Sequence, residues 1–165
     1  MLESSEGWTA DWVWGVPLVV LTVLVHAFGL ALIHQYGVGR LATHLQMRRS
    51  ALVFAAVVGT TALLLTVLHG AEAAAWGTAY VALGALTDPR SAMLFSLNAM
   101  TTYGHDNLGL AEHWRLMGAL EALNGVILFG LSTAYLFAVV QGHWPSRDSI
   151  APPAPPGPRA PTRPT

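Results

Sequence analysis

The 165-residue chain contains no cysteine and no lysine, and only 10% of its residues are charged. Without cysteine, disulfides and thiolate metal ligands are excluded. All eight basic residues are arginine, and a net charge of −1 argues against a nucleic-acid partner. Soluble domains carry about 25% charged residues, whereas this chain is 53% hydrophobic. We therefore expect an all-α membrane protein whose surroundings are the lipid bilayer.

The sequence also lacks the short motifs of hydrolytic and phosphate chemistry. It contains no Gly-x-Ser-x-Gly, no phosphate-binding loop and no His-Glu-x-x-His. We accordingly expect no enzymatic activity and no cofactor.

Three segments supply the run of about 20 apolar residues that a membrane-spanning helix needs. The first is predicted at residues 13–35, and aromatic residues at both of its ends fit the interfacial belts of membrane proteins. The second is predicted at residues 50–86 and the third at residues 115–141. The sequence thus predicts three transmembrane helices.

A shorter helix is predicted between the second and third spans, at residues 89–100. Thr87 or Asp88 suits its N-cap, and Pro89 suits its first helical position. At about 1.5 Å per residue it reaches about 18 Å, roughly half of a bilayer. Two interpretations stay open for this segment: a re-entrant helix packed inside protein, or an interfacial helix lying on the membrane surface.

Arginine distribution gives the expected orientation. Three arginines lie between Arg40 and Arg49, and three more lie in the Pro-rich tail at residues 145–165, which is typical of an extended segment without a core. The positive-inside rule assigns both to the cytoplasm. The protein is then expected in the cell (inner) membrane, with the N-terminal residues 1–12, which include Glu3, Glu6 and Asp11, on the outer side. The segment after the second span is expected on the same outer side.

The end of the short helix and the residues after it, which lead toward the third span, read Ser96-Leu-Asn-Ala-Met-Thr-Thr-Tyr-Gly-His-Asp-Asn107. With the outer and inner helices around it, residues 50–141 resemble the pore of tetrameric potassium channels. More narrowly, the chain is similar to small bacterial ion-channel-family proteins with one extra N-terminal helix. The resemblance implies a pore helix at 89–100 and a filter at 101–107. It also implies a homotetramer around a fourfold axis, because one loop supplies a quarter of a filter, and a permeant monovalent cation, with potassium expected.

The filter sequence departs from the family pattern of Thr, aliphatic, Gly, aromatic, Gly. Tyr103 stands at the aliphatic position, His105 replaces the aromatic residue and Asp106 replaces the second glycine. Four Asp106 side chains would form an acidic ring that attracts cations, and four His105 side chains would form a ring that titrates near neutral pH. We expect altered selectivity. The predicted filter residues are Thr101, Thr102, Tyr103, Gly104, His105 and Asp106.

Four residues of the third span are candidates for a role behind the filter or in gating. Glu121 is a carboxylate inside a predicted membrane span, and such residues are candidates for a functional site because they are costly to bury in lipid. Asn124 shares the same helix face. Glu121 either pairs with Arg115, bonds the back of the filter, or reaches solvent at the interface. Gly125 and Gly130 serve either as a gating hinge or as close-packing positions, and the second reading is favoured.

His26, His69 and Glu72 are polar residues in apolar surroundings. His69 and Glu72 are three residues apart and share a helix face. With His26 they form either a metal or proton site between the first and second spans or a buried hydrogen-bonded link between helices, the favoured reading. The alternative to a channel is a non-conducting membrane subunit, or a metal- or proton-binding membrane protein, on the same scaffold; it could work with a partner subunit.

Overall fold

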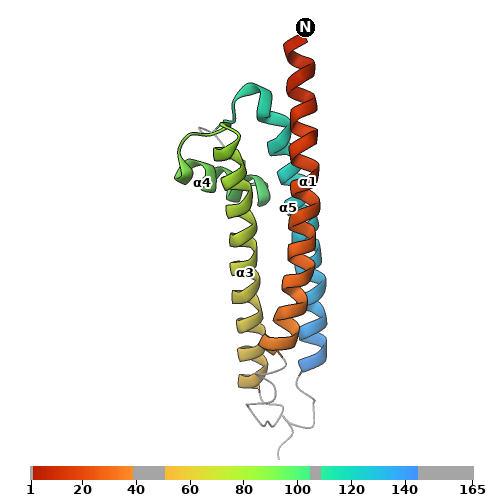
Figure 1. Ribbon diagram of the computed structural model, residues 1–165. Coiled ribbons are helices and arrows are strands. Elements are labelled where there is room, and N and C mark those ends of the chain that lie inside the picture. Colours follow the sequence, from red (N-terminus) through yellow and green to blue (C-terminus); the bar gives the residue numbers. More distant parts are fainter. Residues whose placement is uncertain (1, 39–50, 105–108, 145–165) are drawn as a thin grey trace, which may run out of the picture.

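The computed structural model describes residues 2–38, 51–104 and 109–144. These residues form helices and connecting turns, with no strand among them. Three long helices run side by side (Figure 1): α1 (Leu2–Leu32), α3 (Ala51–Ala82) and α5 (Arg115–His143).

Each long helix belongs to a segment long and apolar enough to cross a membrane. The segments are Trp8–Gly37, Ala51–Ala82 and Glu112–His143, with mean hydropathies of 2.5, 2.4 and 1.9. Large apolar side chains on all three helices are exposed, as expected of surfaces that face lipid or another chain. The chain therefore has the three apolar helices of a multi-pass membrane protein.

The first helix extends further than the sequence indicated. It begins at Leu2, well before residue 13, and after Leu32 it continues as a π-helical stretch, η1 (Ile33–Val38). Close contact with the other helices depends on two small residues: a Cβ atom at Gly15 would lie 2.6 Å from Leu120, and one at Gly29 would lie 2.8 Å from Leu68.

The second helix ends earlier than residue 86, at Ala82, because the chain reverses at Gly84. The Gly84 N–H donates to the Val81 carbonyl (3.1 Å) and the Ala85 N–H to the Tyr80 carbonyl (2.9 Å). This is a Schellman motif, and its left-handed position is filled by Gly84 with φ of +70°. Glycine adopts that conformation without steric cost, so it stops α3 where hydropathy alone would let the helix continue.

The short helix α4 (Pro89–Met100) has the bounds that the capping signals indicated. Asp88 is its N-cap: its carboxylate accepts hydrogen bonds from the Ser91 N–H (2.9 Å) and hydroxyl (2.8 Å). In Figure 1, α4 lies beside the upper part of α3 and runs back toward α5. A 3₁₀ turn, η2 (Glu112–Trp114), then leads into α5.

The largest apolar cluster joins α4 to the long helices, and a smaller one joins Met100 of α4 to Ala73 of α3 and Leu128 of α5. At the centre of the largest cluster α3 and α4 are in contact at Gly77, where a Cβ atom would lie 3.4 Å from the backbone of Ala92. The helix α4 is thus packed against both α3 and α5. The buried core residues are Trp76, Tyr80, Ala85, Ala92, Phe95, Ala99, Leu110, Trp114 and Met117.

Candidate functional site

The segment predicted as the filter begins at the C-terminal end of α4. Thr101 is the C-cap, and its hydroxyl donates to the Leu97 carbonyl at 2.7 Å. The Thr102 N–H then donates to the Ala99 carbonyl (3.0 Å) and the Tyr103 N–H to the Asn98 carbonyl (3.0 Å). These two bonds form a second Schellman motif.

The left-handed position of this motif is filled by a threonine. Thr102 has φ of +56° and is the only non-glycine residue with positive φ in the part of the chain that the structure describes. Such a conformation is uncommon for any side chain and a genuine outlier for a β-branched one. Gly104, two residues later, also has positive φ, at +86°. Positive φ therefore recurs at alternate residues, Thr102 and Gly104, after α4.

The rest of the predicted filter is exposed or lies outside the description. Tyr103 is 84% exposed and projects from the surface of the single chain. Thr101, Thr102 and Gly104 are also exposed. His105 and Asp106 lie outside the described residues.

Glu121 lies behind α4 and is completely buried. The Tyr80 hydroxyl donates to one of its carboxylate oxygens at 2.6 Å, and the Ser96 hydroxyl contacts the other. Ser96 also lies 2.8 Å from the Ala73 carbonyl. The solvent-exposed position considered for Glu121 is not what the structure has, and neither is the pair with Arg115. The carboxylate links α3, α4 and α5.

Arg115 instead lies 3.6 Å from Glu112, and both side chains are exposed. An exposed pair of this kind contributes little to stability.

The other three candidates on α5 lie in different environments. Asn124 is buried, and its side-chain amide donates to the Thr22 hydroxyl of α1 at 2.8 Å. Gly125 faces the end of α4 so closely that a Cβ atom there would lie 2.7 Å from the Met100 Cα. Gly130 is exposed, and a Cβ atom there would meet nothing within 4 Å. Gly125 is thus a close-packing position.

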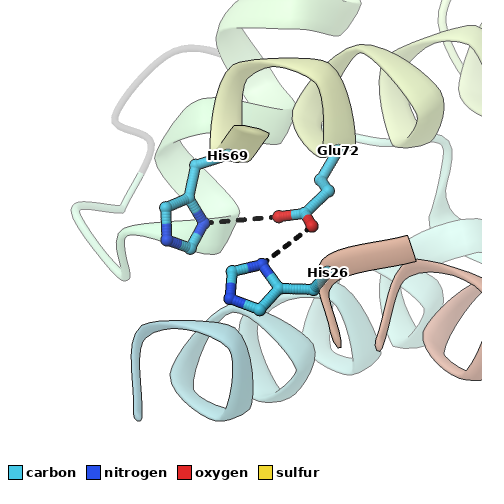
Figure 2. A group of neighbouring side chains, drawn as sticks. All are labelled: His26, His69 and Glu72. Carbon is cyan, nitrogen blue, oxygen red and sulfur yellow. Dashed lines mark hydrogen bonds and ion pairs between the residues drawn. The ribbon is translucent and has the colours of Figure 1, made fainter. Parts of the chain in front are cut away.

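The polar residues of α1 and α3 come together in the middle of the bundle (Figure 2). Glu72 lies between two histidines: one carboxylate oxygen is 2.9 Å from His26 Nδ1, and the other is 3.4 Å from His69 Nδ1. One potential ligand atom from each residue lies within 4.8 Å of the other two. His26 and Glu72 are buried and His69 is partly buried. Two imidazoles and one carboxylate are a donor set that transition metals use.

Ser132 of α5 completes this cluster. Its hydroxyl oxygen lies 3.1 Å from His26 Nε2 and 3.0 Å from His69 Nε2. Ser132 was not predicted as a partner of the histidines. Its spacing does indicate burial, because Ser132 lies eleven residues, or about three helical turns, after Glu121 on the same face of α5. Tyr80, Ser96 and Thr22 were likewise not singled out as partners of the α5 polar residues.

The connectivity Ser132–His26–Glu72 has the order of a hydrolase triad, since a hydroxyl meets one ring nitrogen and a carboxylate the other. Acyl transfer also needs donors aimed at the developing oxyanion. Ser132 lies in the interior of α5, where backbone N–H groups bond within the helix. The arrangement therefore gives no support for hydrolysis.

A pocket of about 330 Å³ lies between α4, the loop that follows it and α5. It brings Thr102 and Gly104 to the same cavity as Arg115 and Gly118. A second pocket, of about 380 Å³, lies between α3 and α4 and is almost wholly apolar.

In comparisons with known proteins, no protein-family model, curated protein or solved structure matches the chain.

Proposed function

We propose that this chain is one subunit of a homotetrameric, potassium-channel-like cation channel of the inner membrane. The observation that carries the proposal is the combination of a half-length helix packed between α3 and α5 with the loop that follows it. That loop, Thr101–Gly104, is exposed and carries positive φ at two alternate residues. A filter needs such backbone to turn carbonyl oxygens toward an axis.

The depth of α4 supports a re-entrant path. Its last residue, Met100, packs on Gly125, which is ten residues into α5 and therefore about 15 Å along that helix. Ser96 contacts the Ala73 carbonyl, nine residues before the end of α3. Ala73 and Gly125 both lie inside segments that are long and apolar enough to cross a membrane, Ala51–Ala82 and Glu112–His143. Non-helical backbone at that depth is tolerated only inside protein or beside water.

Electrostatics favour a cation at this position. The C-terminal end of a helix carries the negative end of its dipole, and the end of α4 leads directly into Thr101–Gly104. Asp106, which lies outside the described residues, would add a carboxylate two residues further along. The site would therefore attract a monovalent cation, with potassium as the expected ion.

A tetramer would cover surfaces that the single chain leaves bare. Tyr103 is 84% exposed, and one loop cannot enclose an ion path. The outward face of α5 is also apolar. Orientation follows the arginines, with the N-terminus outside and residues 145–165 in the cytoplasm. The exposed large apolar residues of α4 and α5 are Leu94, Leu97, Leu123, Val126, Ile127, Phe129, Leu131 and Phe137.

The test is potassium and sodium flux through the purified chain in liposomes, with three glycine variants. Gly104→Ala should abolish flux, because alanine resists φ of +86° and the carbonyls would turn away. Gly109→Ala is the matched control, since it lies in the same connection with open space and no positive φ. Gly84→Ala is the second control, because it imposes the same backbone strain at a distant turn.

Flux should survive in both controls, compared at equal amounts of folded protein. Normal flux through Gly104→Ala would exclude this loop as the filter. A particle without fourfold symmetry, together with no flux in the wild type, would favour the alternative of a non-conducting membrane subunit.

A further inference from the structure

The proposed pore makes no use of the cluster formed by His26, His69 and Glu72. Its geometry is close to that of an ion's ligand shell. Nitrogen and oxygen ligands lie about 2.0–2.2 Å from zinc, so two ligands of one tetrahedral ion lie about 3.3 Å apart. The carboxylate oxygens of Glu72 lie 2.9 Å from His26 Nδ1 and 3.4 Å from His69 Nδ1. One ligand atom from each of the three residues lies within 4.8 Å of the others, so side-chain adjustment would bring them around one ion.

Two atoms of the cluster have no hydrogen-bond partner, although both are buried. They are His69 Nδ1 and the Glu72 oxygen that faces it. Glu72 is only 1% exposed, so bulk water does not reach this oxygen. A buried polar atom without a partner costs free energy, and here two such atoms face each other. A cation between them would satisfy both.

Ser132 supplies the outer support that a metal site needs. Its hydroxyl oxygen lies within 3.1 Å of the Nε2 atoms of both histidines. A hydroxyl has two acceptor lone pairs, so it can accept an N–H from each ring. In that tautomer both Nδ1 atoms would be free to bind an ion, which would replace the 2.9 Å hydrogen bond between His26 Nδ1 and Glu72.

Packing holds the ligands in place. Phe129 stacks on the His69 ring, with ring centroids 4.4 Å apart and an angle of 20° between the planes. One turn after His26, Gly29 lets α1 approach α3 closely at Leu68, the residue before His69. The histidines are thus fixed by the helices that the ion would join.

We infer that His26, His69 and Glu72 bind one divalent transition-metal ion of the zinc class, with Ser132 orienting both imidazoles. Two nitrogen ligands disfavour magnesium and calcium, which prefer oxygen. Three protein ligands leave one coordination position for a water molecule. The ion joins α1 to α3, and through Ser132 to α5, away from the loop Thr101–Gly104.

The experiment measures zinc binding to the full chain in detergent after chelator treatment. Equilibrium dialysis against Zn²⁺ alone should give one ion per chain. Glu72→Gln keeps the shape of the side chain but removes its charge, and binding should be lost. Ser132→Ala should weaken binding about 10- to 100-fold, as expected for an outer-shell partner. His34→Gln is the matched control, because His34 is exposed and stacks edge-on against Tyr135 instead.

Cobalt absorption of the wild-type chain gives a readout that needs no variant. Absorption bands of tetrahedral Co²⁺ that disappear when Zn²⁺ replaces the cobalt would support the site. Folded wild-type protein that binds no ion would overturn the inference and leave the cluster as a hydrogen-bonded junction. Binding that survives in Glu72→Gln would overturn it too, by placing the ion elsewhere. No flux is measured, so failure here leaves the channel proposal intact.

Discussion

The C-terminal ends of α3 and α4 close with the same hydrogen bonds but with different residues. In both, one N–H bonds three residues back and the next bonds five residues back. The left-handed position is Gly84 after α3 and Thr102 after α4. Glycine is the usual occupant of this position, and a residue with a Cβ atom loses about 1–2 kcal/mol there. The end of α4 therefore carries strain that the end of α3 does not.

The surroundings of the two ends also differ. Ala85, which follows Gly84, is 5% exposed and packs into the core, whereas Tyr103, which follows Thr102, is 84% exposed. The α4 end is instead held from behind, by Met100 against Gly125. Strained backbone persists where its surroundings determine it, and it gathers at functional sites. The comparison teaches that the end of α3 is an unstrained turn packed into the core, whereas the end of α4 is a strained turn whose next residue is exposed.

The largest expected effect comes from removing the support behind α4. Gly125→Ala would place a Cβ atom 2.7 Å from the Met100 Cα and closer still to its carbonyl oxygen. Backbone cannot move aside as a side chain can, so we expect a loss of about 1–3 kcal/mol. Thermal unfolding in detergent measures this loss. Flux should fall as well, because the start of the loop is displaced.

Gly130→Ala is the control for that change, since a Cβ atom there meets nothing within 4 Å. It should leave stability unchanged or slightly higher, because alanine favours helices. If both variants unfold alike, the support of α4 by Gly125 is refuted.

Gly84→Ala sharpens the comparison by giving the end of α3 the strain of the end of α4. We expect a loss of about 1 kcal/mol, because alanine at φ of +70° is strained even with open space around it. Flux per folded protein should not change. An unfolding temperature equal to that of the wild type would show that this turn relaxes, and the comparison of the two ends would fail.

Thr102→Gly makes the opposite change. Relief of strain should exceed the added entropy of the unfolded chain, so we expect a gain of about 0.5–1 kcal/mol. Flux should nevertheless fall, since the hydroxyl and the rigidity of the β-branched residue are lost. A variant that is more stable and conducts normally would show that Thr102 has no role in the filter.

The smallest effect is expected at the start of α4. Hydrogen bonds from the Ser91 hydroxyl and N–H hold the pKa of Asp88 below its usual value. The stabilisation from this cap is therefore complete above about pH 4, the ordinary aspartate value, and disappears as the pH falls through the lower pKa of the folded state. Asp88→Ala should lower the unfolding temperature slightly at neutral pH. The difference from the wild type should vanish in strong acid.

Much of the fold could be predicted because lipid imposes simple rules. Length and hydropathy indicated three long helices, and Asp88 with Pro89 marked the start of α4. The end of α3 was misplaced because hydropathy continues to Leu86, whereas Gly84 reverses the chain. Local backbone conformation decided that boundary, and apolar residues on either side of it look alike.

The candidate site was harder, because partners distant in sequence cannot be paired from one chain. Spacing placed His69 beside Glu72 on one face and Ser132 on the same face as Glu121, but it could not show that Ser132 would meet both histidines. The same holds for Tyr80 and Ser96 around Glu121. The identity of the filter stays a prediction, since His105 and Asp106 lie outside the described residues.

The buried polar contacts have a consequence for how the chain enters the membrane. A carboxylate at the centre of a helix costs about 2.5–3.5 kcal/mol on insertion. Glu72 contacts His26, which is synthesised before it. Glu121 contacts Tyr80 and Ser96, which also precede it. During synthesis from the N-terminus, each acidic residue thus reaches the bilayer after its partners, and neither has to face lipid alone.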